Sequence, residues 1–121
     1  MEAGGQAAVL VADDDAALRL LCRVNLELDG YRVLEAASAA EVDRILAAED
    51  VAAILLDVRL GDDDGLALAR ALRSARPGLP VALFTGSVEL ASSWSEIADG
   101  YLPKPFSLDD LGETVRRLVP R

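Results

Sequence analysis

The chain has 121 residues, a net charge of −9 and no histidine. This length suits one domain, and the 52% apolar and 27% charged residues are typical of a folded globular protein rather than a disordered one. The negative charge disfavours direct binding to nucleic acid or to an anionic membrane surface. Without histidine, a histidine-centred catalytic triad and an imidazole metal site are both excluded. We therefore expect carboxylates, hydroxyls or lysine to carry any chemistry.

Nothing in the sequence predicts a membrane or secretory segment. No apolar run approaches the roughly 20 residues of a membrane-spanning helix. The first eight residues lack the positive charge and apolar stretch of a secretory signal. The single cysteine, Cys22, cannot form an internal disulfide, and we expect it to be a small core residue. These features predict a cytoplasmic protein with no membrane association.

Five short apolar runs predict β-strands. Most of them lack alternation, as expected for strands that are buried on both faces of a parallel sheet. The runs are Ala8–Ala12, Tyr31–Ala36, Val51–Leu56, Val81–Phe84 and Tyr101–Leu102.

Segments with helical spacing separate these runs. Ser38 and Glu41 have the spacing of a capping box, Ser107 can cap the last helix, and Gly30 and Pro77-Gly78 can end two others. Within segment 87–99, Ser92, Ser93 and Ser95 are mediocre helix formers, so we expect a short or irregular fourth helix there. The predicted apolar faces are Leu18, Leu21, Cys22 and Leu28; Val42, Ile45 and Leu46; Leu68, Ala71, Leu72 and Ala75; and Leu108, Leu111, Val115 and Leu118.

The alternation of strands and helices predicts an α/β fold, a doubly wound parallel sheet covered by helices on both sides. No linker, repeat or low-complexity tract interrupts it. We expect residues 1–121 to form a single domain with a core from about 8 to 119, and no output domain.

Reactive side chains follow four of the five predicted strands. Asp13 and Asp14 follow the first, Asp57 the third, Thr85 the fourth and Lys104 the fifth. Ligands of open parallel sheets bind beyond the carboxyl ends of the strands, so these groups are predicted to share one rim. The next residue, Asp15, is interpreted as the start of a helix.

Three carboxylates at one rim need compensating positive charge. Two of them about 5 Å apart repel by roughly 3 kcal/mol at an effective dielectric constant of about 20. Lys104 neutralises one charge, and Mg²⁺, which prefers carboxylate oxygens, would offset the rest. A carboxylate can also attack a phosphoryl group to form an acyl phosphate, for which positioning and charge neutralisation are the main requirements. The rim therefore predicts phosphoryl chemistry with magnesium.

Four motifs match the receiver domains of bacterial response regulators. They are VLVADDD (Val9–Asp15), LLDVRL (Leu55–Leu60) with Asp64-Gly65 downstream, FTG (Phe84–Gly86) and GYLPKPF (Gly100–Phe106). The resemblance extends from about Ala8 to Val119. It implies a flavodoxin-like three-layer sandwich whose five parallel strands have the order 2-1-3-4-5.

The resemblance also implies a role for each rim residue. Asp57 resembles the phosphoacceptor. Asp14, Asp57 and the backbone carbonyl of Arg59 resemble the direct Mg²⁺ ligands, and Asp13 the residue that orders a metal-bound water. Thr85 and Lys104 resemble the groups that bind the phosphoryl oxygens. Tyr101 matches the aromatic switch position, although it also fits a half-buried edge-strand tyrosine, and the Lys104–Pro105 peptide is expected to be cis.

By the same resemblance, the chain is a signalling phosphoacceptor rather than an enzyme acting on a separate substrate, although it would catalyse its own phosphorylation and dephosphorylation. The implied partners are a histidine kinase or phosphotransfer protein and a downstream output protein. The domain could stand alone, or belong to a larger regulator or a hybrid histidine kinase.

Two positions depart from the family pattern. Gly61 replaces a proline that is common four residues after the acceptor, so we expect a more mobile loop over Gly61–Gly65. Thr85 and Lys104 lie 19 positions apart, which is shorter than usual in the family and shortens the fourth helix. Because that helix is part of the usual dimer surface, the sequence leaves dimerisation and the usual Thr85–Tyr101 coupling open.

Three other classes of protein share part of this pattern. A haloacid dehalogenase-type phosphatase would use Asp13 and Asp15, but Ala17 stands where a hydroxyl or valine is expected. A docking module that is never phosphorylated is compatible with Gly61 but does not explain the complete set of rim residues. A flavodoxin would need a phosphate-binding loop after the first strand, where the three aspartates would repel phosphate.

Overall fold

The computed structural model describes residues 6–86 and 94–120. Five parallel strands form one sheet in the order β2-β1-β3-β6-β7. Strands β6 and β7 are the fourth and fifth strands of this sheet along the chain, because β4 and β5 form a separate hairpin. The order is therefore the predicted 2-1-3-4-5, and the predicted topology is confirmed. Their bounds are β1 Ala8–Ala12, β2 Arg32–Ala36, β3 Ala53–Asp57, β6 Val81–Thr85 and β7 Gly100–Pro103.

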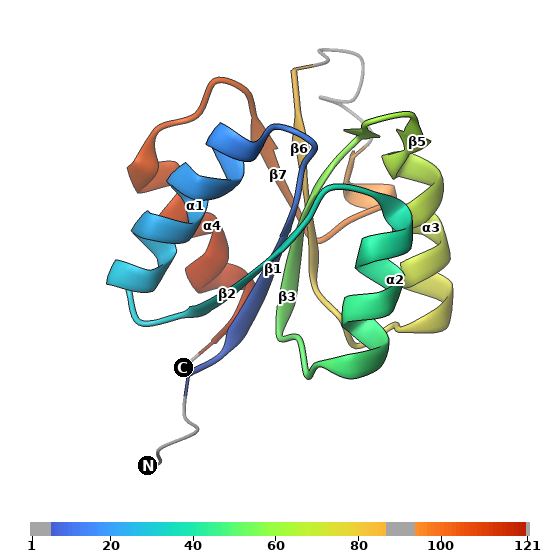
Figure 1. The fold of residues 1–121 in the computed structure, drawn as a ribbon, viewed down its shortest axis with the longest axis horizontal. Coiled ribbons are helices and arrows are strands. Elements are labelled where there is room, and N and C mark those ends of the chain that lie inside the picture. The colour runs from blue at the N-terminus through green and yellow to red at the C-terminus, as the bar shows by residue number, and fades with distance from the viewer. Residues whose placement is uncertain (1–5, 87–93, 121) are drawn as a thin grey trace.

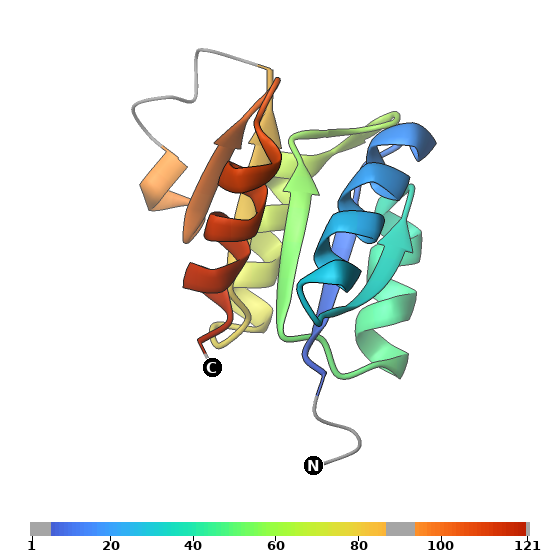
Figure 2. The same cartoon turned by 90° about the vertical axis from the view of Figure 1, so that its left-hand side faces the viewer.

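Helices cover both faces of the sheet and give the predicted three layers. Helices α1 (Ala16–Leu28) and α4 (Leu108–Leu118) lie on one side, and α2 (Ala39–Ala48) and α3 (Gly65–Ala75) on the other (Figures 1 and 2). Of the expected fourth helix, the described part holds one short 3₁₀ turn, η2 (Trp94–Glu96). Residues 87–93 lie outside the described part. No described helix is long and apolar enough to span a bilayer.

The interior strand β1 shows why the apolar runs lack alternation. All five of its residues are buried. Val9 and Val11 pack in the core beneath α1 and α4, whereas Leu10 and Ala12 belong to the core beneath α2 and α3. Burying each valine or leucine contributes roughly 1.5–3 kcal/mol. A polar residue on either face would therefore lose a core contact.

Capping residues lie at the predicted ends of the helices. The Asp15 carboxylate accepts hydrogen bonds from the backbone N–H groups of Ala17 and Leu18. The hydroxyls of Ser38 and Ser107 each accept one from the amide three residues later. Gly30 follows α1 with a φ of +95°, a conformation that favours glycine. These capping predictions are confirmed.

The predicted apolar face of α1 is wrong in part. Cys22 and Leu26 are fully buried, but Leu21 is 45% and Leu28 80% exposed. The helix carries apolar residues on two sides, and periodicity alone does not tell which side meets the sheet. Burial raises the pKa of the Cys22 thiol to about 12, with a further contribution from the nearby Asp13 charge, so the thiol stays protonated at neutral pH.

The predicted apolar face of α3 is also wrong in part. Leu72 is buried as predicted, but the neighbouring core residue is Ala69. Ala71 and Ala75 are exposed. Small alanines fit either side of a helix, so they carry little information about which side is buried.

A two-stranded hairpin follows β3. Strands β4 (Arg59–Leu60) and β5 (Asp63–Asp64) pair antiparallel around Gly61, whose φ is +63°. The Asp63 carboxylate accepts a hydrogen bond from the Ala39 amide at the start of α2, at 2.8 Å. The sequence prediction did not include this hairpin, although Gly61-Asp62 is a recognised two-residue turn signal. The mobility expected for Gly61–Gly65 stays a prediction.

Gly65 sets how closely α3 approaches the end of β3. A Cβ atom there would overlap the Asp57 carbonyl oxygen and lie 2.8 Å from the Val58 Cα. We expect Gly65→Ala to lower the free energy of unfolding by about 2 kcal/mol or more, because backbone atoms must move to accept the methyl group. Urea unfolding measures this change. Gly78→Ala is the control, since a Cβ there meets nothing within 4 Å. Equal stabilities for the two variants would contradict the packing argument.

Candidate phosphoryl and metal site

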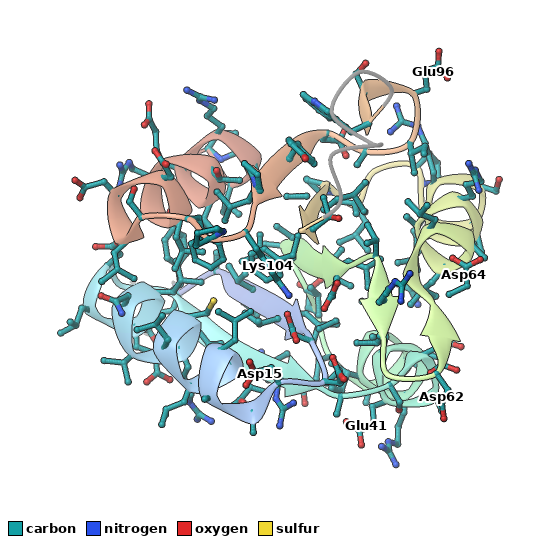
Figure 3. All side chains as sticks on the ribbon, turned by 90° about the horizontal axis from the view of Figure 1, so that it is seen from above. Asp15, Glu41, Asp62, Asp64, Glu96 and Lys104 are labelled. Atoms are coloured by element: carbon teal, nitrogen blue, oxygen red, sulfur yellow. The ribbon has the colours of Figure 1, made fainter. Side chains whose placement is uncertain are left out.

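A cavity of about 550 Å³ opens at the carboxyl ends of the strands. Its walls come from the ends of β3, β6 and β7, from the loop after β1 and from the β4–β5 hairpin. Seen from above, Lys104 lies near the middle of the molecule, with Asp15, Asp62 and Asp64 further out (Figure 3). The lining residues are Asp14, Asp57, Val58, Arg59, Gly61, Thr85, Gly86 and Lys104.

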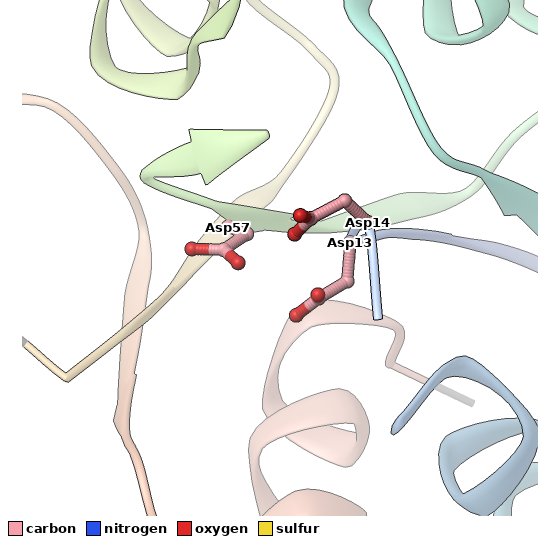
Figure 4. Close-up of side chains that lie close together, drawn as sticks. All are labelled: Asp13, Asp14 and Asp57. Atoms are coloured by element: carbon pink, nitrogen blue, oxygen red, sulfur yellow. The ribbon is translucent and has the colours of Figure 1, made fainter. Parts of the chain in front are cut away.

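Three carboxylates converge beside this cavity. One oxygen of each of Asp13, Asp14 and Asp57 lies within 4.8 Å of the others (Figure 4). Asp13 is fully buried, Asp57 is 7% exposed and Asp14 is exposed. Asp13 and Asp14 follow β1 and Asp57 ends β3, which are neighbouring strands. The structure thus brings together the acidic residues that the sequence predicted at one rim.

Lys104 compensates two of these charges. Its Nζ atom lies 2.8 Å from the Asp13 Oδ2 atom and 3.0 Å from the Asp57 Oδ2 atom, and its side chain is 28% exposed. Burial lowers the pKa of Lys104, but its hydrogen bonds and charge interactions with Asp13 and Asp57 outweigh that effect and raise the pKa above its usual 10.5. A pKa raised on folding stabilises the protein below the unfolded value, and this stabilisation is lost as the pH rises through the folded value. The Lys104 contribution therefore persists across neutral pH and is lost only in strong alkali.

The charge balance of the site fits a divalent cation. Three carboxylates and one ammonium leave a formal charge of −2. Carboxylate and backbone carbonyl oxygens are the ligands that Mg²⁺ prefers, and Mg²⁺ usually keeps several waters in such sites. Asp14 and Asp57 line the cavity, whereas Asp13 is buried behind it. The residues present therefore suit a magnesium ion.

Hydrogen bonds fix the two buried carboxylates. The Asp13 Oδ1 atom accepts from the Asp15 amide at 2.9 Å, so both Asp13 oxygens have protein donors. The Asp57 Oδ1 atom accepts from the Arg59 amide at 3.0 Å. Asp15, which the phosphatase interpretation would use as the acid, instead caps α1. The phosphatase interpretation therefore lacks its second catalytic carboxylate.

Thr85 ends β6 in contact with the segment that carries Lys104. The Lys104 amide donates to the Thr85 carbonyl oxygen at 2.8 Å. Thr85 is buried but lines the cavity. The Lys104–Pro105 peptide is cis, as the sequence resemblance implied. The Lys104 ammonium also lies 5.8 Å from the centre of the Phe84 ring, close enough for a cation–π contact.

Tyr101 lies apart from the cavity lining. Its ring stacks on the Trp94 ring with centroids 5.9 Å apart and an angle of 9° between the planes. Tyr101 is half-buried, in β7. The position therefore fits both earlier interpretations, an edge-strand tyrosine and a switch residue, and its switching stays a prediction.

Sequence reasoning missed Arg19. Its Nη1 atom donates to the Asp13 carbonyl oxygen at 2.6 Å, and its Nε atom donates to the Glu35 Oε1 atom at 3.0 Å. Arg19 lies on the sheet side of α1, where a mostly buried arginine interrupts the apolar pattern. That interruption was the available signal, because a charged side chain on a buried face needs a partner.

Comparison with known proteins gives one family. The model of the response regulator receiver domain matches residues 9–116. The chain is 36% identical over 116 residues to the response regulator MprA of Mycolicibacterium vanbaalenii, covering 93% of this chain and 50% of that protein. It is also 36% identical to MprA of Mycobacterium ulcerans, with the same coverage. The chain thus spans about half the length of these curated relatives.

Solved structures give the same result. A CheY-like receiver domain protein from Methanospirillum hungatei superposes with a TM-score of 0.84, at 32% identity and 93% coverage of both chains. The response regulator TrrA from Thermotoga maritima, solved in complex with Mg²⁺ and BeF, gives 0.86 at 27% identity, covering 94% of this chain and 100% of that one. With the family model, the shared fold and the converging rim residues in agreement, this chain belongs to the response regulator receiver domain family, the phosphoacceptors of two-component systems.

Proposed function

We propose that Asp57 is the residue that accepts the phosphoryl group. The observation that carries this proposal is the arrangement around the cavity, where the Asp57 carboxylate lies beside a lysine ammonium, a threonine and a second cavity-lining carboxylate. Asp57 is held at the end of β3 by its hydrogen bonds to Lys104 and to the Arg59 amide. A nucleophile that is already oriented reduces the entropic cost of reaction.

Phosphorylation would form a bond between an Asp57 carboxylate oxygen and phosphorus as the bond between phosphorus and the donor breaks. With a phosphohistidine donor, the departing electron pair remains on the imidazole, which takes up a proton. Lys104 would neutralise negative charge on the phosphoryl oxygens, and the Thr85 hydroxyl would donate a hydrogen bond to one of them. In dephosphorylation, a separate reaction, water attacks phosphorus, the bond between phosphorus and the Asp57 oxygen breaks, and the Asp57 carboxylate and phosphate are released. Self-catalysed dephosphorylation is part of this proposal.

Mg²⁺ is the proposed cofactor. Asp14, Asp57 and the backbone carbonyl of Arg59 would be its direct protein ligands, with Asp13 acting through a bound water. The formal charge of −2 and the oxygen-rich rim support this assignment. The complex of the related TrrA protein with Mg²⁺ and BeF is consistent with it. When bound, the ion supplies charge neutralisation at the phosphoryl oxygens.

The proposed phosphodonor is a histidine kinase or a phosphotransfer protein. Helix α1 begins directly after the acidic loop and exposes four large apolar side chains: Leu20, Leu21, Val24 and Leu28. Ala17, Leu21, Val24 and Leu28 follow one another at steps of four, three and four residues, a spacing typical of a helix that packs against another helix. This face supports docking of a helical phosphodonor beside the acceptor. A downstream output protein completes the proposed set of partners.

The metal proposal is tested with two aspartates that are adjacent in sequence. We expect Asp14→Asn to weaken Mg²⁺ binding by about tenfold or more, because one direct carboxylate ligand is lost. In metal-free buffer the same variant should raise the free energy of unfolding by up to about 1 kcal/mol, since it removes repulsion in a solvent-screened position. Isothermal titration calorimetry and urea unfolding measure the two effects. Asp15→Asn is the control, because asparagine caps helices as well as aspartate does. Equal Mg²⁺ affinity in all three proteins would refute the ligand assignment.

The acceptor proposal is tested by mass spectrometry. With acetyl phosphate and Mg²⁺, we expect the protein to gain one phosphoryl group that is labile in base, as acyl phosphates are. Asp57→Asn should not gain it, because an amide oxygen is a far weaker nucleophile than a carboxylate. Asp64→Asn is a suitable control, since Asp64 caps α3 and does not line the cavity. Equal labelling of Asp57→Asn and the wild type would exclude Asp57 as the acceptor.

The predicted role of Tyr101 as a switch residue is tested through the single tryptophan, Trp94. If drawing Thr85 toward the phosphoryl group moves the neighbouring β7, the stack of Trp94 on Tyr101 should change. We expect beryllofluoride with Mg²⁺ to shift the Trp94 fluorescence, and Thr85→Val to reduce the shift because it lacks the hydroxyl. Unchanged fluorescence in the wild type, under conditions where beryllofluoride binding is verified by mass spectrometry, would show that Tyr101 is not part of a switch.

A further inference from the structure

Arg19 connects α1 to the loop that carries the acidic residues. Its guanidinium donates through Nη1 to the Asp13 carbonyl oxygen at 2.6 Å and through Nε to Glu35 in β2 at 3.0 Å. The side chain is 17% exposed, so water competes little for these donors. Charge-assisted hydrogen bonds of this kind are stronger than those between neutral groups.

The contact acts on the peptide that joins Asp13 to Asp14. The Asp13 carbonyl and the Asp14 N–H belong to one planar unit, which rotates as a whole. A hydrogen bond that holds the carbonyl oxygen therefore also fixes the orientation of the peptide plane before Asp14. The Asp13 side chain is fixed separately by Lys104 and by the Asp15 amide, so the Arg19 bond adds a restraint on the backbone between the two acids.

Glu35 holds the arginine in place from the other side. Its Oε1 atom accepts from Arg19, and its Oε2 atom accepts from the Arg23 Nη1 atom at 2.9 Å. Glu35 stands opposite Val11 in the pairing of β2 with β1, one residue before the last pair of that ladder. The guanidinium is thus fixed between the strand next to the acidic loop and the loop itself.

We propose that Arg19 is a positioning residue for the metal site: by holding the Asp13–Asp14 peptide, it directs the Asp14 carboxylate into the cavity. This inference rests on the proposed Mg²⁺ site. Arg19 acts through the Asp13 backbone and is not itself a ligand. The two-point geometry requires a guanidinium, because its N–H groups are fixed in a planar fork whereas an ammonium is a compact charge on a flexible chain.

A purely electrostatic role predicts the opposite result. Arg19 carries a positive charge near the acids, so its removal should favour binding of a divalent cation if charge alone mattered. If Arg19 positions the loop, its removal should weaken binding. The sign of the change in Mg²⁺ affinity therefore distinguishes the two roles.

The test measures Mg²⁺ affinity by titration calorimetry in the wild type, Arg19→Met, Arg19→Lys and Arg23→Met. We expect Arg19→Met to weaken binding by about tenfold, as is usual when a group that orients a ligand is lost. Arg19→Lys should also weaken binding although its charge is retained, and it serves as the test variant if Arg19→Met does not fold. Arg23→Met is the matched control, since Arg23 shares Glu35 but does not contact Asp13, and its affinity should stay within about twofold of the wild type.

Phosphorylation kinetics give the second measurement. The rate with acetyl phosphate should need more Mg²⁺ for half-saturation in Arg19→Lys, with the saturated rate close to that of the wild type. Unchanged or tighter Mg²⁺ binding in Arg19→Met and Arg19→Lys would overturn the positioning role while leaving the metal site intact. Absence of Mg²⁺ binding in the wild type would instead overturn the proposed cofactor, and this inference with it.

Discussion

The ammonium of Lys104 joins three strands of the sheet at their carboxyl ends. It lies just after β7, yet its hydrogen bonds reach Asp13 after β1 and Asp57 in β3, which are 91 and 47 residues away in sequence. Asp13 is fully buried, and a buried charge without a partner is strongly destabilising. Both the sheet order and the course of the segment after β7 bring these groups together. Lys104 therefore offsets much of the cost of burying Asp13 and Asp57, together with the amides of Asp15 and Arg59.

Much of the fold could be predicted because strong local signals agree with the tertiary structure. The three interior strands, β1, β3 and β6, are buried on both faces, so their apolar composition identified them as strands without the help of alternation. Ser38, Ser107 and Asp15 mark helix starts through short-range hydrogen bonds that depend on sequence spacing alone. Once the elements alternate, parallel-strand geometry brings Asp13, Asp57, Thr85 and Lys104 to one edge. The set of residues at the rim could therefore be predicted from the order of strands and helices along the chain.

The sequence did not predict features for which several alternative side-chain contacts are possible and tertiary packing selects one of them. On α1, apolar residues occupy two sides, and tertiary packing selects Leu26 rather than Leu28 for the core. The bond between Asp63 and the start of α2 spans 24 residues and has no local signature. The contact of Arg19 with the Asp13 carbonyl involves a backbone acceptor, which every residue has, so no residue type marks it. Such choices are set by three-dimensional packing rather than by spacing.

Lys104 is also the only lysine in the chain, since every other cationic side chain is an arginine. Amine-directed reagents such as succinimidyl esters therefore have one side-chain target besides the chain's amino terminus. That target is held in the protonated, unreactive form by two carboxylates. Lysine cross-linking would consequently give almost no distance information on this domain in a complex. Coupling through the exposed members of its 21 aspartate and glutamate side chains would report its surface instead.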